Sequence, residues 1–148
     1  MVWKPNVTVA AVIPRDNKFL LVEEVTKHGT RFNQPAGHLE ADESLLAAVV
    51  RETLEESAYH FHPTHLIGIY HWHSKESDTT YLRFAYAGEI TGHEPERKLD
   101  TGIIRADWFT LDEIRDTQAR HRSPLILRCV EDYLAGKRYP LEILTHYD

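Results

Sequence analysis

The stretch of the chain that carries most information about its fold is residues 37–58, GHLEADESLLAAVVRETLEESA. Six acidic residues and one basic residue lie between positions 40 and 56, so this segment has a net charge of −5 in a chain of net charge −6. Apolar residues recur in it at helical spacing, which predicts an amphipathic helix over residues 43–57. At 3.6 residues per turn, Glu52, Glu55 and Glu56 fall within an arc of about 100°.

The acidic face of this predicted helix is unfavourable unless something neutralises it. Glu52 forms like-charge pairs with Glu55 and Glu56, and each pair destabilises a helix by roughly 0.2–0.5 kcal/mol. Arg51 offers one opposing charge to three carboxylates, whereas a divalent cation would offset them, and hard oxygen ligands suit Mg²⁺ or Mn²⁺. A solvated acidic surface is the alternative. The residues expected to face the core from the opposite side are Leu46, Val50, Thr53 and Leu54.

The remainder of the chain alternates predicted strands and helices. Runs of β-branched and aromatic residues predict strands at residues 7–13, 18–24, 31–34, 66–72, 81–90 and 107–110. Asp16-Asn17 predicts a hairpin turn between the first two strands, and Pro35-Ala36-Gly37 is expected to form a loop. Helices are expected at residues 111–117 and from Ser123-Pro124 to Gly136. The core-facing residues expected on the last helix are Ile126, Cys129, Val130, Tyr133 and Leu134. Strands interspersed with helices predict an α/β or α+β fold.

Length and composition exclude several classes of protein. A chain of 148 residues predicts one domain, residues 1–148, and a single cysteine cannot form an internal disulfide. No apolar run is long enough for a membrane span, and a net charge of −6 argues against nonspecific nucleic-acid binding. We therefore expect a cytoplasmic protein, monomeric or homodimeric, that binds neither nucleic acid nor membrane.

The spacing of the acidic segment resembles the signature of the Nudix hydrolase family. That signature reads Gly, five residues, Glu, seven residues, Arg-Glu, an apolar residue, any residue, Glu-Glu, any residue and Gly. The matching positions here are Gly37, Glu43, Arg51, Glu52, Glu55 and Glu56. Six fixed matches arise by chance about once in 10⁷–10⁸ windows. Thr53 stands where an aliphatic residue is usual, and Ala58 replaces the final Gly, which is expected to cost on the order of 1 kcal/mol or to shift the helix end.

Segments outside the signature look like one bacterial subgroup of that family, the NudJ-type phosphatases. They are residues 4–9, 33–40, 122–125 and 136–142. The resemblance implies an α/β/α sandwich around a mixed sheet and a Mg²⁺-dependent hydrolase, with Mn²⁺ as a substitute. The implied substrates are small diphosphates: thiamine diphosphate, hydroxymethylpyrimidine diphosphate and nucleoside di- and triphosphates. The implied reaction is direct attack by water with release of terminal phosphate.

The resemblance also implies roles for individual residues. The implied catalytic residues are Glu52, Glu55, Arg51 and Glu43, with Arg51 orienting Glu55 or Glu43. The implied metal ligands are Glu52, Glu55, Glu56 and the carbonyl of Gly37. Some members use a base outside the signature, and the candidates are Glu94, Glu96 and Asp100, which otherwise form a solvated loop.

Specificity must come from residues outside the signature. Phe32, Trp72 and Tyr81 are candidates for stacking on a substrate ring, with core packing as the alternative. Arg83 is a candidate for pairing with a phosphate, with a cross-strand salt bridge as the alternative. A zinc site at His60-x-His62 or His71-x-His73 is less favoured, since no Cys cluster accompanies them. The alternative functions are a non-catalytic nucleotide-binding or regulatory Nudix-like module and a passive cation-binding protein.

Overall fold

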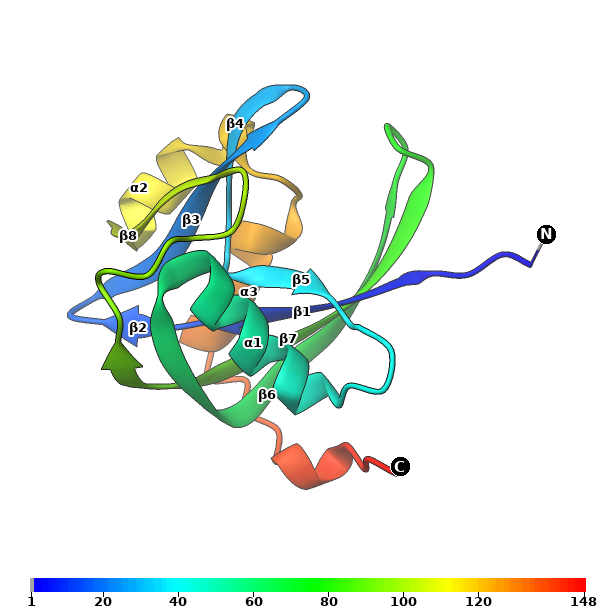
Figure 1. Ribbon diagram of the computed structural model, residues 1–148. Coiled ribbons are helices and arrows are strands. Elements are labelled where there is room, and N and C mark those ends of the chain that lie inside the picture. The colour runs from blue at the N-terminus through cyan, green and yellow to red at the C-terminus, as the bar shows by residue number, and fades with distance from the viewer. Residues whose placement is uncertain (1) are drawn as a thin grey trace.

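A mixed four-stranded sheet forms the centre of the molecule in a computed structural model that describes residues 2–148. Its strands run in the order β5 (Ala36–His38), β1 (Asn6–Val12), β7 (Thr79–His93) and β6 (Tyr59–Ser74). β1 is parallel to β7, and the other two pairings are antiparallel. Helix α1 (Leu45–Ser57) lies on one face and α3 (Leu125–Leu134) on the other (Figure 1). This arrangement confirms the expected α/β/α sandwich around a mixed sheet.

The apolar run in β1 explains its position between two helices. Side chains alternate along a strand. Val9 and Ala11 belong to the core cluster that includes residues of α1, whereas Val12 belongs to the cluster that includes residues of α3. Because both faces of β1 are covered, both must be apolar, and the strand reads as a continuous hydrophobic run.

A second sheet consists of antiparallel strands. It contains β2 (Pro14–Arg15), β3 (Lys18–Thr26), β4 (Gly29–Asn33) and β8 (Ile103–Thr110), and β3 pairs with each of the other three. The remaining elements are α2 (Leu111–Asp116) and the short 3₁₀ turns Gln118–Arg120 and Leu141–Ile143. In the described part of the chain, no helix has both the length and the apolar composition that crossing a bilayer requires.

The predicted hairpin between residues 7–13 and 18–24 is wrong in its pairing. β1 pairs with β5 and β7 in the first sheet, and only the short strand β2 folds back on β3. Asp16 and Asn17 still form the tight turn, with φ values of 51° and 63°. The chain changes sheets after Val12, because the doubly apolar β1 must lie in the centre of the sandwich.

The predicted loop at Pro35-Ala36-Gly37 is also wrong in part. Ala36–His38 forms β5, an edge strand antiparallel to β1. The amide of Ala11 donates to the carbonyl of Pro35 at 3.0 Å, which fixes the entry to this strand. Gly37 is therefore held on a sheet edge that faces α1, rather than in a free loop.

Helix α1 begins at Leu45, two residues later than expected, and buries a different face. The Ser44 side chain accepts a hydrogen bond from the amide of Ala47, so it caps the helix, and Glu43 lies just before the cap. Of the four residues expected in the core only Thr53 is buried, and Leu46, Val50 and Leu54 are half-buried. The buried residues are Ala48, Val49, Glu52, Thr53, Glu56 and Ser57. Two carboxylates of the acidic face thus lie on the buried side of the helix.

Helix α3 ends as predicted at Gly136, which has a φ of 84°. The amide of Leu125 donates to the hydroxyl of Ser123, which therefore caps the start of the helix. Leu134 was expected in the core, but it is half exposed, and Asp132 is buried instead. The hydroxyl of Tyr70 donates to Asp132, so a hydrogen bond rather than an apolar contact fixes this end of the helix.

Candidate active site

The Glu52 carboxylate packs directly against Gly37, and this contact forms the floor of the candidate site. A Cβ atom added at Gly37 would lie 2.2–2.4 Å from the carboxylate atoms of Glu52. No side chain fits at such distances, so the backbone of β5 and the carboxylate of α1 can meet only because residue 37 is glycine. The carboxylate therefore lies directly against the backbone that carries the Gly37 carbonyl.

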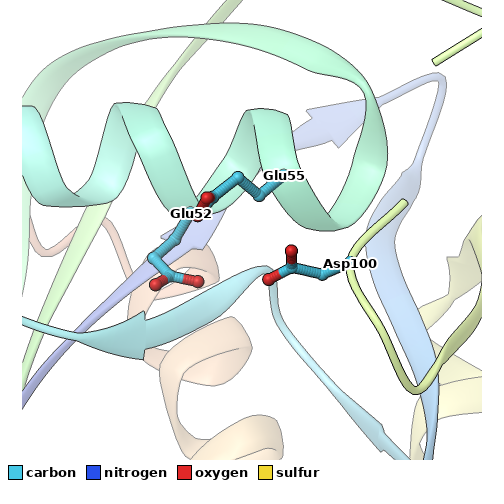
Figure 2. A group of neighbouring side chains, drawn as sticks. All are labelled: Glu52, Glu55 and Asp100. Atoms are coloured by element: carbon cyan, nitrogen blue, oxygen red, sulfur yellow. The ribbon is translucent and has the colours of Figure 1, made fainter. Parts of the chain in front are cut away.

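Three carboxylates converge beside this contact. Oxygen atoms of Glu52, Glu55 and Asp100 lie within 4.8 Å of one another. Figure 2 shows Glu52 and Glu55 projecting from α1 and Asp100 reaching towards them from the segment before β8. The amide of Asp100 donates to the carbonyl of Glu55 at 2.9 Å, which anchors that segment on the helix. Hard oxygen donors in this number and spacing fit a divalent cation.

Glu56, another predicted metal ligand, is not among these three converging carboxylates, although it is as little exposed as Glu52. Its Oε1 accepts a hydrogen bond of 3.0 Å from the amide of Ala36 in β5. The pKa of Glu56 is raised to about 8, mainly by burial; the hydrogen bond from Ala36 opposes the rise, and the charges of Glu24, Glu52 and Asp100 add to it. Burial also raises the pKa of Glu52, against the opposing effect of Arg51. Ionising both carboxylates is therefore costly at this buried position, and a bound cation would relieve this cost.

Arg51 holds three of the acidic side chains in place. Its Nε and Nη2 atoms donate to the two carboxylate oxygens of Glu43 at 2.6 and 3.0 Å. Its Nη1 atom donates to Glu52 at 2.7 Å and to Glu55 at 2.8 Å. The hydrogen bonds from Arg51 lower the pKa of Glu43, which also accepts from the amide of Glu40. Arg51 therefore contacts both Glu55 and Glu43, the two carboxylates that the family resemblance implies it orients.

Asp100 alone of the three candidates outside the signature joins the group. Glu94 instead binds His60 and Arg97, and Glu96 is exposed. Sequence reasoning could not separate the three, because the choice depends on a contact between residues 55 and 100.

Among residues 2–148, the one group of potential metal ligands contains no histidine. His73 pairs with Asp78 at the end of the β6–β7 hairpin.

The substrate-binding candidates occupy three different environments. Phe32 is buried at 2% exposure and packs edge-on against Phe109. Trp72 and Tyr81 stack on each other with ring centroids 5.6 Å apart. Trp72 also lines a groove of about 580 Å³ between the end of the β6–β7 hairpin and the start of α3. Arg83 is buried and binds two amide side chains, so the alternative of a cross-strand salt bridge is not the contact observed.

An α/β/α sandwich whose helix directs carboxylates at a glycine of the sheet can hold a divalent cation, as a metal-using hydrolase requires. The chain matches the NUDIX domain over residues 4–129 and belongs to the Nudix family. It is 39% identical to Phosphatase NudJ of Escherichia coli K12 over 146 residues, which cover 99% of this chain and 94% of the relative.

Solved structures agree with this assignment. A NUDIX hydrolase from Nitrosomonas europaea is 58% identical with a TM-score of 0.95, and the match covers 97% of this chain and 98% of that one. A MutT NUDIX hydrolase from Burkholderia pseudomallei shares the fold at 20% identity, with a TM-score of 0.74 and coverage of 88% and 98%. The protein is therefore a hydrolase of phosphorus-containing anhydrides, and Nudix hydrolases generally use divalent metals and small-molecule substrates.

Proposed function

We propose that the protein is a Mg²⁺-dependent hydrolase of small diphosphates that releases terminal phosphate by direct attack of water. Its substrates would be thiamine diphosphate, hydroxymethylpyrimidine diphosphate and nucleoside di- and triphosphates. The observation that carries the proposal is the convergence of Glu52, Glu55 and Asp100 beside the Gly37 backbone. The name of the relative, a phosphatase, supports release of phosphate.

In this proposal Glu52, Glu55, Glu56 and the carbonyl of Gly37 hold the metal, with Asp100 at the edge of the site. Bound Mg²⁺ supplies charge neutralisation and polarises the phosphoryl oxygens of the substrate. Arg51 orients Glu52 and Glu55, and Glu43 fixes Arg51 through its paired hydrogen bonds. A carboxylate oxygen of Asp100 receives the proton of the attacking water, since Arg51 already donates to Glu52 and Glu55. Glu56 is less suited to this role because it is buried and accepts from the amide of Ala36.

We further propose that residues 1–148 act as one domain in the cytoplasm, as a monomer or homodimer without nucleic-acid or membrane partners. The net charge of −6 supports the absence of nucleic acid. Sedimentation of the purified protein, with and without duplex DNA, tests both the oligomeric state and the absence of this partner. Sedimentation of the protein together with the DNA at physiological salt would contradict the proposed absence of a nucleic-acid partner.

The decisive experiment measures phosphate release from a panel of diphosphates and triphosphates with Mg²⁺ and with EDTA. We expect release only with the metal, and a loss of at least about 100-fold in kcat for Glu52→Gln and Glu56→Gln, because each removes a charged ligand. Glu142→Gln, an exposed residue of the last 3₁₀ turn, is the matched control and should keep full activity. Wild-type turnover in either site variant would refute the metal assignment, and tight binding without release would favour the non-catalytic module.

Gly37→Ala provides a second variant for the same experiment. The added Cβ would overlap the Glu52 carboxylate, so we expect activity to fall by a similar factor while the protein stays folded.

With a nucleoside triphosphate as substrate, the identity of the products shows which phosphoanhydride bond the wild-type protein cleaves. Nucleoside diphosphate and phosphate support terminal cleavage, whereas nucleoside monophosphate and pyrophosphate would contradict it.

A further inference from the structure

Arg83 lies inside the molecule, where side chains of the protein bind its guanidinium. It lies in β7 between Thr8 of β1 and Tyr70 of β6, and it is only 6% exposed. Its Nη1 atom donates to Oε1 of Gln34 and its Nη2 atom to Oδ1 of Asn33, both at 2.9 Å. Both terminal nitrogens therefore bind protein amides, and the guanidinium is largely closed to solvent.

The two residues whose side-chain amides bind Arg83 directly precede residues 35–37, whose backbone lies beside the carboxylates of α1. Asn33 ends β4 and Gln34 follows it. Gln34 is 1% exposed, and its Nε2 atom donates to the carbonyl of Ile126 in α3 at 2.8 Å. Arg83 and α3 thus hold Gln34 from both ends of its amide. The chain at this point cannot shift without breaking buried hydrogen bonds.

The next three residues make the contacts of the active site. The carbonyl of Pro35 accepts from Ala11, the amide of Ala36 donates to Glu56, and Gly37 lies against Glu52. A displacement of Asn33 and Gln34 would therefore move Gly37 relative to the carboxylates of α1. Groups that orient metal ligands in this way typically change metal affinity or activity 10–100-fold when removed.

We propose that Arg83 is a positioning residue for the hydrolase reaction. It fixes Asn33 and Gln34 at the end of β4 and so sets the Gly37 backbone against Glu52 and Glu56. The planar fork of a guanidinium suits two acceptors at once, which the ammonium of lysine cannot reproduce. The proposal rests on the proposed function, since this position matters only if Gly37 and the glutamates hold the metal.

The test compares Arg83→Met and Arg83→Lys with the wild-type protein. We expect both variants to lower kcat by about 10–100-fold, by the same factor for thiamine diphosphate and a nucleoside triphosphate, with KM unchanged. Electron paramagnetic resonance of Mn²⁺ should show weaker metal binding to both, without substrate present. The matched control is Arg115→Met, a half-exposed arginine of α2, for which kcat and Mn²⁺ affinity should not change.

Two results would overturn the proposal. Wild-type kcat and Mn²⁺ binding in Arg83→Met would show that the position of the loop does not depend on this residue. Restored activity in Arg83→Lys, with a rise in KM in Arg83→Met that is larger for the triphosphate, would instead identify a direct phosphate contact.

Asn33→Ala keeps the test decisive if Arg83→Met does not fold. It removes one partner from a half-buried position and leaves the arginine in place. We expect it to lower kcat and Mn²⁺ affinity with KM unchanged, and the double variant with Arg83→Lys to be no worse than Arg83→Lys alone. Additive losses would overturn the proposal. Glu52→Gln, measured in parallel, separates the two hypotheses: its full activity would refute the proposed function, whatever the Arg83 variants do.

Discussion

At the scale of single residues, burial sets the chemistry of the site. Glu52 and Glu56 lie on the buried side of α1, although a buried carboxylate is costly without a partner. Arg51 offsets part of this cost for Glu52, whereas Glu56 has one hydrogen bond from the backbone. A structural role alone would be served better by apolar residues, so their burial fits side chains that hold a cation against the sheet.

His121 gives the protein a pH dependence that is separate from the carboxylate site. Burial lowers its pKa from the ordinary value of 6.5. The unfolded chain then binds a proton more readily than the folded one, so the contribution to stability is complete above pH 6.5 and is lost as the pH falls below it.

We expect His121→Gln to remove this contribution. In urea unfolding with EDTA present, the free-energy difference between the wild type and His121→Gln should shrink as the pH falls from about 7.5 to about 5.5. A difference that stays constant over this range would contradict the assignment.

At the scale of secondary structure, the end of α1 connects the helix to the loop that carries Asp100. Ala58 has a left-handed conformation with a φ of 65°, so the helix ends where the family signature has Gly, and the end is not shifted. The carbonyl of Ala58 accepts from the amide of Glu94, at the start of the segment that leads to Asp100. The backbone at this residue therefore affects both elements of the site.

Substitutions at Ala58 test this connection. Ala58→Gly relieves about 1 kcal/mol of strain but loses a buried methyl group worth about 0.8 kcal/mol, so the unfolding free energy should change by less than about 1 kcal/mol. Ala58→Val places a β-branched residue in the left-handed region and should destabilise the protein by about 2 kcal/mol, with a lower kcat. Urea unfolding and phosphate release measure both effects. Equal stability of Ala58→Val and the wild type would show that α1 ends differently.

At the scale of the whole molecule, the site joins α1, β5 and the segment before β8, so a bound cation should stabilise the complete fold. With Mg²⁺ at about 100 times its dissociation constant, the free energy of unfolding should rise by about 2.7 kcal/mol. Urea unfolding with Mg²⁺, compared with EDTA at equal ionic strength, measures this rise. Glu52→Gln should show a much smaller one, and an equal rise in both proteins would place the cation elsewhere.

The sequence by itself determined the local features of this protein. Helix α1 and the spacing of its glutamates follow from residues within four positions of one another, where helical geometry fixes the neighbours. The alternation of strands and helices also predicted the fold class. The family resemblance added the details of the sandwich and the class of reaction.

Only the tertiary structure decided which distant residues meet. β1 lies in a different sheet from β3, with which a hairpin was expected. Folding also brings Asp100 to Glu52 and Glu55, and Arg83 to Asn33 and Gln34. The tertiary structure also determined which side of α1 is buried. The contacts of Asp100 and Arg83 join residues that are at least 45 positions apart in the sequence. No local pattern encodes such pairs, because they depend on how two apolar layers pack on the two faces of one sheet.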